Sequence, residues 1–121
     1  MSRLRSKTEP TSGPGLESLS ASDRRLVEQF LVLLRNEFGP RLRDFRVFGS
    51  KIRGETHEES DLDLLVLIKQ RTTADRTRII SAALDLSPWI DVKVIDWDAY
   101  HSPMSRATGF YKEMRQHSVR P

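Results

Sequence analysis

The chain has 121 residues, of which 37% are hydrophobic and 31% charged, with a net charge of +3 and no cysteine. This length suits one domain with a substantial core, and the missing cysteines exclude disulfides and thiolate metal sites, as expected in a reducing cytoplasm. No apolar run is long enough to span a membrane, and the basic N-terminus lacks the apolar core of a signal peptide. The charge balance permits an anionic partner such as a nucleotide or a nucleic acid, but direct nucleic-acid binding is not required.

The first segment, residues 1–19, carries prolines, glycines and basic residues but few apolar ones. This composition predicts a disordered basic arm, and residues 20–121 are expected to form a single domain. From Ser20 the pattern becomes helical, with Ser20 or Ser22 as the N-cap and Gly39-Pro40 as the stop. The apolar stripe of this helix comprises Leu26, Val27, Phe30, Leu31, Leu34 and Phe38.

A short strand is predicted over residues 41–48, and it leads directly into Gly49-Ser50. A glycine lets a ligand approach the backbone closely, and a serine offers both a hydroxyl and an N–H to an anion. Residues 51–54 are expected to form one helical turn, and the polar residues 55–60 a loop. Gly49-Ser50 is therefore a candidate phosphate-binding turn, although most Gly-Ser pairs are simple turns.

The clearest predicted strand covers residues 61–69, and its apolar run is typical of a central strand covered on both faces. Asp61 and Asp63 share one face at its start because strand side chains alternate. Two carboxylates about 4 Å apart repel each other by roughly 4 kcal/mol at an effective dielectric constant near 20. The pair therefore indicates either a bound metal ion or a raised pKa.

The rest of the chain continues the alternation of helices and strands. A helix from Thr72 or Thr73 to about residue 86 is expected to bury a stripe of Ile79, Ile80, Ala83 and Leu84. A third strand covers residues 89–97, Asp98 is expected to cap a short turn, and a last helix runs over residues 105–117. This order predicts an α/β (α+β) fold in which helices flank a small mixed sheet.

Three acidic positions, Asp61, Asp63 and Asp91, fall on two strands that could be neighbours. A carboxylate inside a strand, as at Asp91, is unusual unless it is functional. Such a set suits two-metal phosphoryl or nucleotidyl transfer, because Mg²⁺ prefers oxygen ligands and bridging carboxylates can hold two ions. The alternative is that Asp61 and Asp63 only mark a solvated strand end.

Several other polar and aromatic residues leave two interpretations open. Arg53 either binds a nucleotide phosphate or pairs with Glu55, and Lys93 either neutralises phosphate or offsets the acids. The histidines show no metal-ligand spacing, and the tryptophans and the two tyrosines after residue 99 are interpreted as packing residues. These residues are His57, His101, His117, Trp89, Trp97, Tyr100 and Tyr111.

The succession Gly-Ser, Ile-Arg-Gly, Ser-Asp-Leu-Asp-Leu-Leu-Val and Asp-Val-Lys-Val resembles the minimal nucleotidyltransferases of the DNA polymerase beta superfamily, over residues 20–117. The resemblance implies the nucleotidyltransferase fold. It also implies that Asp61, Asp63 and Asp91 are catalytic and bind two Mg²⁺ ions. In the same way, Gly49 and Ser50 would contact the phosphates of the nucleotide, with ATP as the substrate.

Many stand-alone domains of this size resemble antitoxins that transfer AMP from ATP to a tyrosine of a helical HEPN ribonuclease toxin. This chain departs from their pattern at Ile52, where alanine is frequent, and at Gln116-His117, where Glu-Gly is frequent. Two alternatives remain: a non-catalytic antitoxin that acts by complex formation, and a nucleotidyltransferase of small molecules such as aminoglycosides. The latter class usually needs an additional substrate-binding domain. The acceptor, the base of the nucleotide and the oligomeric state stay open.

Overall fold

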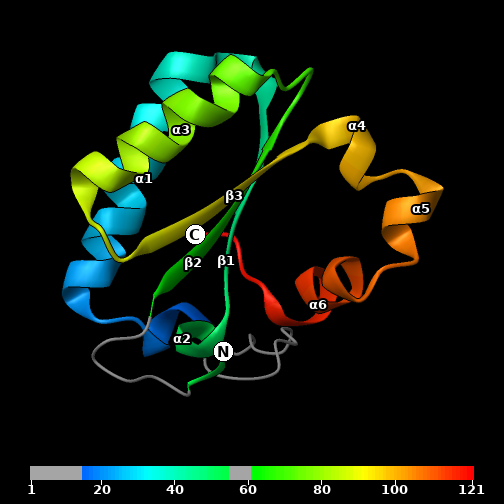
Figure 1. Cartoon of the computed structure of the whole chain (residues 1–121). Helices are drawn as coiled ribbons and strands as arrows, with labels where there is room; N and C mark the ends of the chain where they lie inside the picture. Colours follow the sequence, from blue (N-terminus) through cyan, green and yellow to red (C-terminus); the bar gives the residue numbers. More distant parts are fainter. Residues whose placement is uncertain (1–14, 55–60) are drawn as a thin grey trace, which may run out of the picture.

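A computed structural model describes residues 15–54 and 61–121 of the chain (Figure 1). In chain order the elements are η2 (Gly15–Ser18), α1 (Ala21–Phe38), η3 (Gly39–Arg41), β1 (Leu42–Phe48), α2 (Ser50–Arg53), β2 (Leu62–Ile68), α3 (Thr73–Leu86), β3 (Ile90–Asp96), α4 (Trp97–Tyr100), α5 (Pro103–Arg106) and α6 (Gly109–His117). None of the helices in these ranges combines the length and apolar character that a membrane crossing requires. The loop predicted over residues 55–60 lies outside the described residues.

The three strands form one sheet in the order β1-β2-β3. β1 pairs with β2 in antiparallel orientation, and β2 pairs with β3 in parallel orientation, so β2 is the central strand. Beyond β1, Val119 forms an isolated antiparallel bridge with Val47, which brings the end of the chain against the edge of the sheet. The predicted fold class, a small mixed sheet flanked by helices, is confirmed.

Helices α1 and α3 cover one face of the sheet (Figure 1). The even-numbered residues of β2 point into this layer and are buried: Leu62, Leu64, Val66 and Ile68. They pack with Phe30 and Leu34 of α1 and Ile79 of α3, all fully buried. Burying an aliphatic or aromatic side chain of this size contributes about 1.5–3 kcal/mol, so this layer is the main source of stability.

The short helices α4–α6 cover only part of the opposite face. Leu65 and Leu67 of β2 are fully buried there, against Tyr100, Tyr111 and Met114. Phe48 at the end of β1 belongs to the same cluster, and its ring meets the Phe110 ring edge-on at 6.0 Å. This cover ends before the first residues of β2 and β3 are reached.

The helix starts follow from local capping. The Ser20 side chain accepts a hydrogen bond from the Asp23 N–H at the start of α1, and Thr72 and Asp75 form a capping box at the start of α3. The cap predicted at Asp98 is wrong. Asp96 caps α4 by accepting from the Ala99 N–H, and its other oxygen accepts from the Arg71 N–H, which ties the end of β3 to the loop after β2.

The single helix predicted over residues 105–117 is also wrong, because two helices occupy this region. Ser102 caps α5, which ends at Arg106, and the Thr108 side chain then accepts from the Tyr111 N–H to start α6. Thr108 and Gly109 are weak helix formers, whereas threonine is a good N-cap, so the chain restarts a helix here.

The disordered arm predicted over residues 1–19 is wrong for residues 15–19, and residues 1–14 lie outside the described part of the chain. η2 is a 3-10 helix, and Leu19 after it is buried in the core. Ser18 fixes this turn by donating from its hydroxyl to the carbonyl oxygens of Gly15 and Lys51. Leu19 lies in the core and Leu16 packs against it, so this segment belongs to the folded domain although its composition is mostly polar.

The stripe predicted for α3 is partly wrong. Ile79 and Ala83 are buried and Ile80 packs against the core as expected, but Leu84 is 56% exposed and Ala82 takes the remaining buried position. α3 lies beside α1 as well as on the sheet, so its buried face is set by two neighbours and is wider than the apolar stripe of the sequence suggests.

Candidate active site

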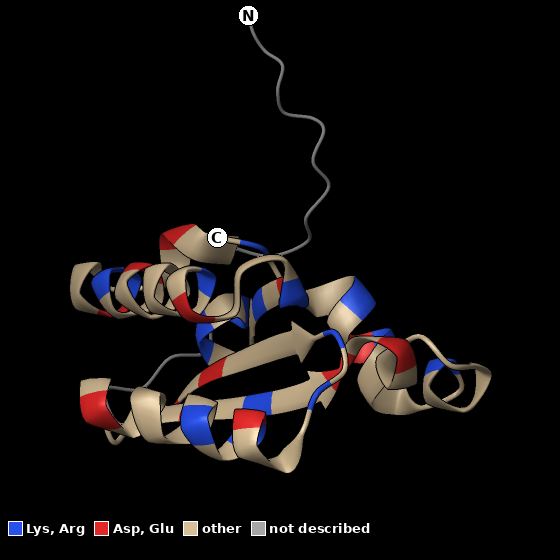
Figure 2. Cartoon of the chain, turned by 90° about the horizontal axis from the view of Figure 1, so that it is seen from above, with Lys and Arg blue, Asp and Glu red and all other residues tan. Residues whose placement is uncertain are grey.

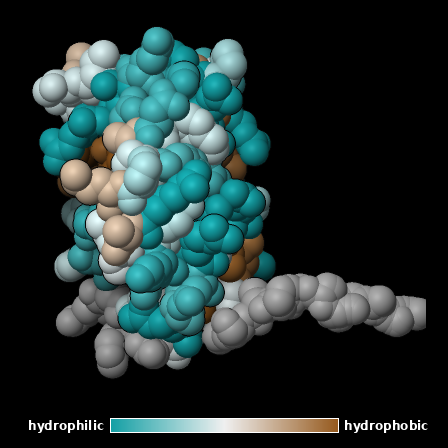
Figure 3. Space-filling model, turned by 90° about the vertical axis from the view of Figure 1, so that its right-hand side faces the viewer, coloured by the Kyte–Doolittle hydropathy of each residue, from teal (hydrophilic) through white to brown (hydrophobic). Residues whose placement is uncertain are grey.

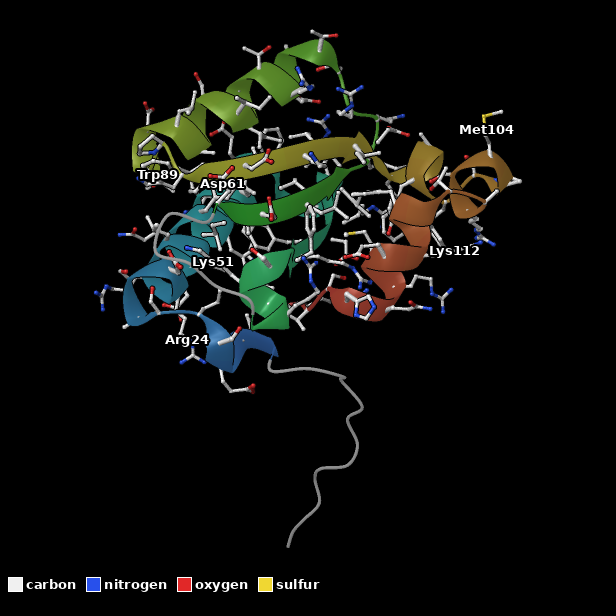
Figure 4. All side chains as sticks on the ribbon, turned by 60° about the horizontal axis from the view of Figure 1, so that its bottom comes forward. Arg24, Lys51, Asp61, Trp89, Met104 and Lys112 are labelled. Carbon is white, nitrogen blue, oxygen red and sulfur yellow. The ribbon has the colours of Figure 1, made fainter. Side chains whose placement is uncertain are left out.

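Asp63 and Asp91 lie side by side on the open part of the sheet. They are register partners on β2 and β3, and paired residues of adjacent parallel strands point to the same face, about 4.8 Å apart between strand axes. Asp63 is half-buried and Asp91 exposed. Asp61 comes directly before β2, two residues from Asp63, and its side chain is exposed at the same end of the sheet (Figure 4).

The Gly49 turn lies against Asp63 because Asp63 is the register partner of Phe48 on β1. Gly49 has φ +88° and ψ −167°, a conformation that is essentially restricted to glycine. A Cβ atom at this position would lie 2.0 Å from Asp63 Oδ2. Glycine is therefore required here twice, for its backbone conformation and for the space that the Asp63 carboxylate occupies.

Ser50 follows this turn as the first residue of α2 and is half-buried. The Gly49 carbonyl accepts hydrogen bonds from the N–H groups of Ile52 and Arg53, which fold the chain back immediately after the turn. The structure thus brings Gly49, Asp63 and Asp91 together on three adjacent segments, with Ser50 at the edge of the group.

The electrostatics of this group follow from its burial and its like charges. Burial first, then the carboxylates of Asp91 and Asp61, raise the pKa of Asp63 to about 6, while Lys93 and Arg53 act in the opposite direction. A cation between the carboxylates would relieve this repulsion. Three carboxylates and no softer ligand suit a hard cation such as Mg²⁺.

The residues present supply only part of a metal coordination shell. Within residues 15–54 and 61–121, no three His, Cys, Asp or Glu side chains converge closely enough to form a metal cage by themselves. Mg²⁺ usually keeps several waters and binds through one or two carboxylates together with substrate phosphates. The acidic group therefore fits a metal that shares its ligands with a substrate.

Two basic residues border the acidic group. Arg53 donates from Nη1 to Glu113 Oε2 at 3.3 Å, an exposed contact that links α2 to α6. Its predicted alternative partner, Glu55, lies outside the described residues. Lys93 is exposed two residues after Asp91 on β3, where it is the register partner of Leu65. Both cations lower the pKa of Asp63 through their charge.

Lys51 is a structural residue of the site that sequence reasoning missed. It is buried, only 8% exposed, and its Nζ donates to Asp23 Oδ2 on α1 at 2.6 Å (Figure 4). A lysine is rarely buried unless it is paired. The pair fixes α2, and with it the Gly49 turn, against α1. The signal in the sequence was a lysine directly after Gly49-Ser50, but its partner is 28 residues away.

Trp89 lies at the rim of the site and not in the core, so its predicted packing role is wrong. It is 58% exposed, and its carbonyl accepts from the Leu62 N–H at 2.8 Å. Figure 4 shows Trp89 and Asp61 at the same end of the sheet. Trp97, at the other end of β3, is half-buried and packs against the hydrophobic cluster that contains the buried Tyr100 and Tyr111. The packing role predicted for these three residues therefore agrees with the structure.

Residues 39–108, more than half of the chain, match the family described as polymerase beta, nucleotidyltransferase. A solved structure described as a minimal nucleotidyltransferase is 29% identical, with a TM-score of 0.57, and the match covers 91% of this chain and 99% of that one. No protein of curated function matches the sequence.

Two further solved structures match part of the chain. One chain of a mutant MntA–HpeT toxin–antitoxin complex is 23% identical, with a TM-score of 0.50, over 77% of this chain and 69% of its own. A protein described as a nucleotidyltransferase from Sulfolobus solfataricus is 25% identical, with a TM-score of 0.49, over 67% of this chain and 72% of its own. The family match confirms the resemblance seen in the sequence: this chain belongs to the polymerase beta nucleotidyltransferase family.

Proposed function

We propose that the protein is a magnesium-dependent nucleotidyltransferase that transfers AMP from ATP to a tyrosine hydroxyl of a partner protein. The observation that carries the proposal is the register pair of Asp63 and Asp91, which lies on the open part of the sheet and against the side-chain-free turn at Gly49. Membership of the family supports the transferase chemistry. The choice of ATP and of a protein acceptor follows the resemblance to small antitoxins.

The residues of the site divide the work between them. Asp61, Asp63 and Asp91 would hold two Mg²⁺ ions, which when bound neutralise the carboxylates and the phosphates of the nucleotide. Gly49 leaves the Asp63 carboxylate its space and lets a phosphate approach the backbone, and Ser50 offers its hydroxyl to the same phosphate.

The transfer itself exchanges a phosphoanhydride bond of ATP for a phosphate ester of the acceptor. The acceptor oxygen forms a bond to the α-phosphorus of ATP, and the bond from that phosphorus to the pyrophosphate oxygen breaks. The hydroxyl proton passes to a carboxylate oxygen of Asp91, which is exposed beside Asp63, and pyrophosphate leaves with the electron pair. Arg53 and Lys93 offset the negative charge that the triphosphate brings to this face.

We propose that the acceptor is a helical HEPN-type ribonuclease toxin and that the protein acts as its antitoxin in the cytoplasm. One chain of the MntA–HpeT toxin–antitoxin complex has a fold similar to that of this protein. This likeness supports the choice of a toxin as the partner. In that mutant complex two aspartates, spaced as Asp61 and Asp63 are, were changed to glutamates. Among the described residues Asp91 is exposed beside the half-buried Asp63, so a side chain of a protein-sized acceptor can reach this part of the sheet.

The proposal is tested with ATP labelled in its α-phosphate, the purified protein, and a purified helical HEPN-type protein as the acceptor. Label should pass to the helical protein, and Asp61→Ala/Asp63→Ala should abolish the transfer while the fold is retained. Asp85→Ala, which removes an exposed carboxylate of α3, is the matched control and should transfer normally. Undiminished labelling in the double variant would contradict the proposed mechanism.

The same assay separates the two alternatives. If the double variant still silences the toxin although no label is transferred, the protein acts by complex formation. If label appears only on small hydroxyl compounds offered in place of the helical protein, the protein is a small-molecule nucleotidyltransferase.

A further inference from the structure

A cavity lies on the same face of the sheet as the acidic group, at the opposite end. It has a volume of about 310 Å³ and is bounded by β1, α4, α6 and the C-terminal segment. Its lining residues are Asp44, Arg46, Trp97, Tyr100, His101, Tyr111, Arg115 and Arg120. None of the residues placed at the candidate active site takes part.

The two sites are separated by packed side chains. Asp44 is the register partner of Leu67, four residues along β2 from Asp63, which is roughly 13 Å of strand. Phe48 and Phe110 fill the space between, together with the buried Met114. Binding in this cavity is therefore a property independent of the acidic group.

The cavity has an excess of positive charge. Three arginines line it against one carboxylate, Asp44, which accepts from Arg46 Nε at 2.9 Å and from Arg120 Nε at 2.9 Å. Arg46 Nη1 donates to Ser118 Oγ at 3.0 Å. Within the described residues Arg46 Nη2 and Arg120 Nη1 have no acceptor, and Arg115 has no hydrogen-bond partner for its side chain.

Two tyrosine hydroxyls add neutral donors to these guanidinium groups. Tyr100 and Tyr111 are 5% and 9% exposed, yet neither hydroxyl has a hydrogen-bond partner in residues 15–54 and 61–121. Both side chains line the cavity, and neither hydroxyl oxygen is among the buried atoms without a partner in the described residues, so both hydroxyls are open to the cavity. Each hydroxyl is therefore available to donate to an occupant that accepts hydrogen bonds.

The nature of the occupant follows from the donors. Arginine guanidinium groups bind phosphate oxygens through paired N–H donors, and two tyrosine hydroxyls can complete the coordination of a dianion. Base stacking is not part of this site, because the Trp97 ring is already flanked by His101, at 4.1 Å between ring centroids, and by the Arg43 guanidinium at 5.7 Å. We propose that this cavity binds a phosphate group through Arg115, Arg46, Arg120 and the hydroxyls of Tyr100 and Tyr111.

A phosphate group can come from inorganic phosphate, from pyrophosphate, from a mononucleotide or from the end of a nucleic-acid strand. The test is an NMR titration of the labelled full chain with each of four probes: inorganic phosphate, pyrophosphate, AMP and a short single-stranded RNA. The backbone signals of Tyr100, Tyr111 and Arg115 should shift saturably with at least one probe. The probe that saturates them at the lowest concentration identifies the source.

Three variants separate a built site from a general attraction of anions. Arg115→Gln should weaken binding of the best probe by about tenfold. Lys112→Gln, which removes the same charge from the outer side of α6 (Figure 4), should change it less than twofold. Tyr111→Phe removes only a hydroxyl without a protein partner, so it should weaken binding about fivefold and leave thermal stability unchanged or slightly raised.

Two results would overturn the proposal. The first is the absence of saturable shifts at these three residues with all four probes. The second is an equal loss of affinity in Arg115→Gln and Lys112→Gln, which would show attraction by net charge alone. A titration of Asp63→Asn should match the parent protein, because the acidic group lies outside this cavity.

Discussion

The two faces of the central strand β2 have opposite characters. On the face under α1 and α3 every residue from Leu62 to Ile68 is aliphatic and at most 1% exposed. On the other face the strand begins with a half-buried aspartate, Asp63, and becomes apolar only at Leu65. In Figure 2 the strands are mostly tan with a few charged bands, whereas the helices carry most of the charge.

The difference shows how one short strand serves stability and chemistry together. Strand side chains alternate, so each face can be optimised without changing the other. The closed face supplies buried area, and the open face carries like charges whose repulsion is retained in the fold. The outer surface over α4–α6 is mostly hydrophilic (Figure 3). The following predictions test whether the two faces are in fact separable.

The largest effect on stability is expected on the closed face. Leu64→Ala removes a fully buried side chain and should lower the free energy of unfolding by about 2–5 kcal/mol. The measurement is urea denaturation followed by far-UV circular dichroism. Leu84→Ala, at a position 56% exposed, is the control and should cost under about 0.5 kcal/mol. Equal losses in both variants would contradict the assignment of the core.

A substitution of Gly49, where β1 ends, is expected to lower stability by less than Leu64→Ala does but to reduce AMP transfer strongly. Gly49→Ala places a methyl group against the Asp63 carboxylate and in a strained backbone conformation. It should cost about 1–3 kcal/mol of stability and reduce AMP transfer at least about a hundredfold, because it displaces the carboxylate. Gly109→Ala, where a Cβ meets nothing within 4 Å, should leave transfer unchanged. Normal transfer in Gly49→Ala would argue against the acidic group.

Asp44 lies on the same face of the sheet as Asp63, but it stabilises the fold through ion pairs with Arg46 and Arg120. Burial tends to raise its pKa, but the hydrogen bonds from Arg120 and Arg46 outweigh burial and leave the pKa below its ordinary value of 3.8. Its carboxylate also accepts from the Phe45 N–H at 2.9 Å. Asp44→Asn should therefore lower the free energy of unfolding at pH 7 by about 1–3 kcal/mol.

The pH dependence of this loss has a definite sign. A carboxyl whose pKa is depressed in the fold stabilises fully above its unfolded pKa, and the contribution disappears as the pH falls through the folded value. The parent protein and Asp44→Asn should thus differ at pH 7 and converge below pH 3.8, as thermal melts across this range can show. A constant difference across this range would contradict the ion pairs of Asp44.

Much of the fold could be predicted from local signals. Ser20, Thr72 and Gly39 mark helix ends through capping chemistry that depends on near neighbours, and the apolar run of β2 identifies a central strand. The predictions failed where distant contacts decide. Leu19 is buried through long-range packing, and Asp96 rather than Asp98 caps α4 because it also receives the Arg71 N–H.

In the candidate active site, too, local features could be predicted from the sequence and long-range contacts could not. The spacing of Asp61 and Asp63 indicated a shared face, but the alignment of Asp63 with Asp91 depends on the register of a parallel pair, which no local pattern specifies. The contact between Gly49 and Asp63 depends on the register of the antiparallel pair. Lys51 could not be recognised because its burial and its partner on α1 follow from tertiary packing.

The central claim is that the carboxylates of the open face form a divalent cation site. Binding of Mn²⁺, as a paramagnetic substitute for Mg²⁺, can be measured from the free-ion signal in electron paramagnetic resonance, with a non-hydrolysable ATP analogue present. Asp63→Asn and Asp91→Asn should each weaken Mn²⁺ binding at least about tenfold. Asp85→Asn on α3 should bind like the parent protein. Equal Mn²⁺ affinity in all four proteins would contradict the account.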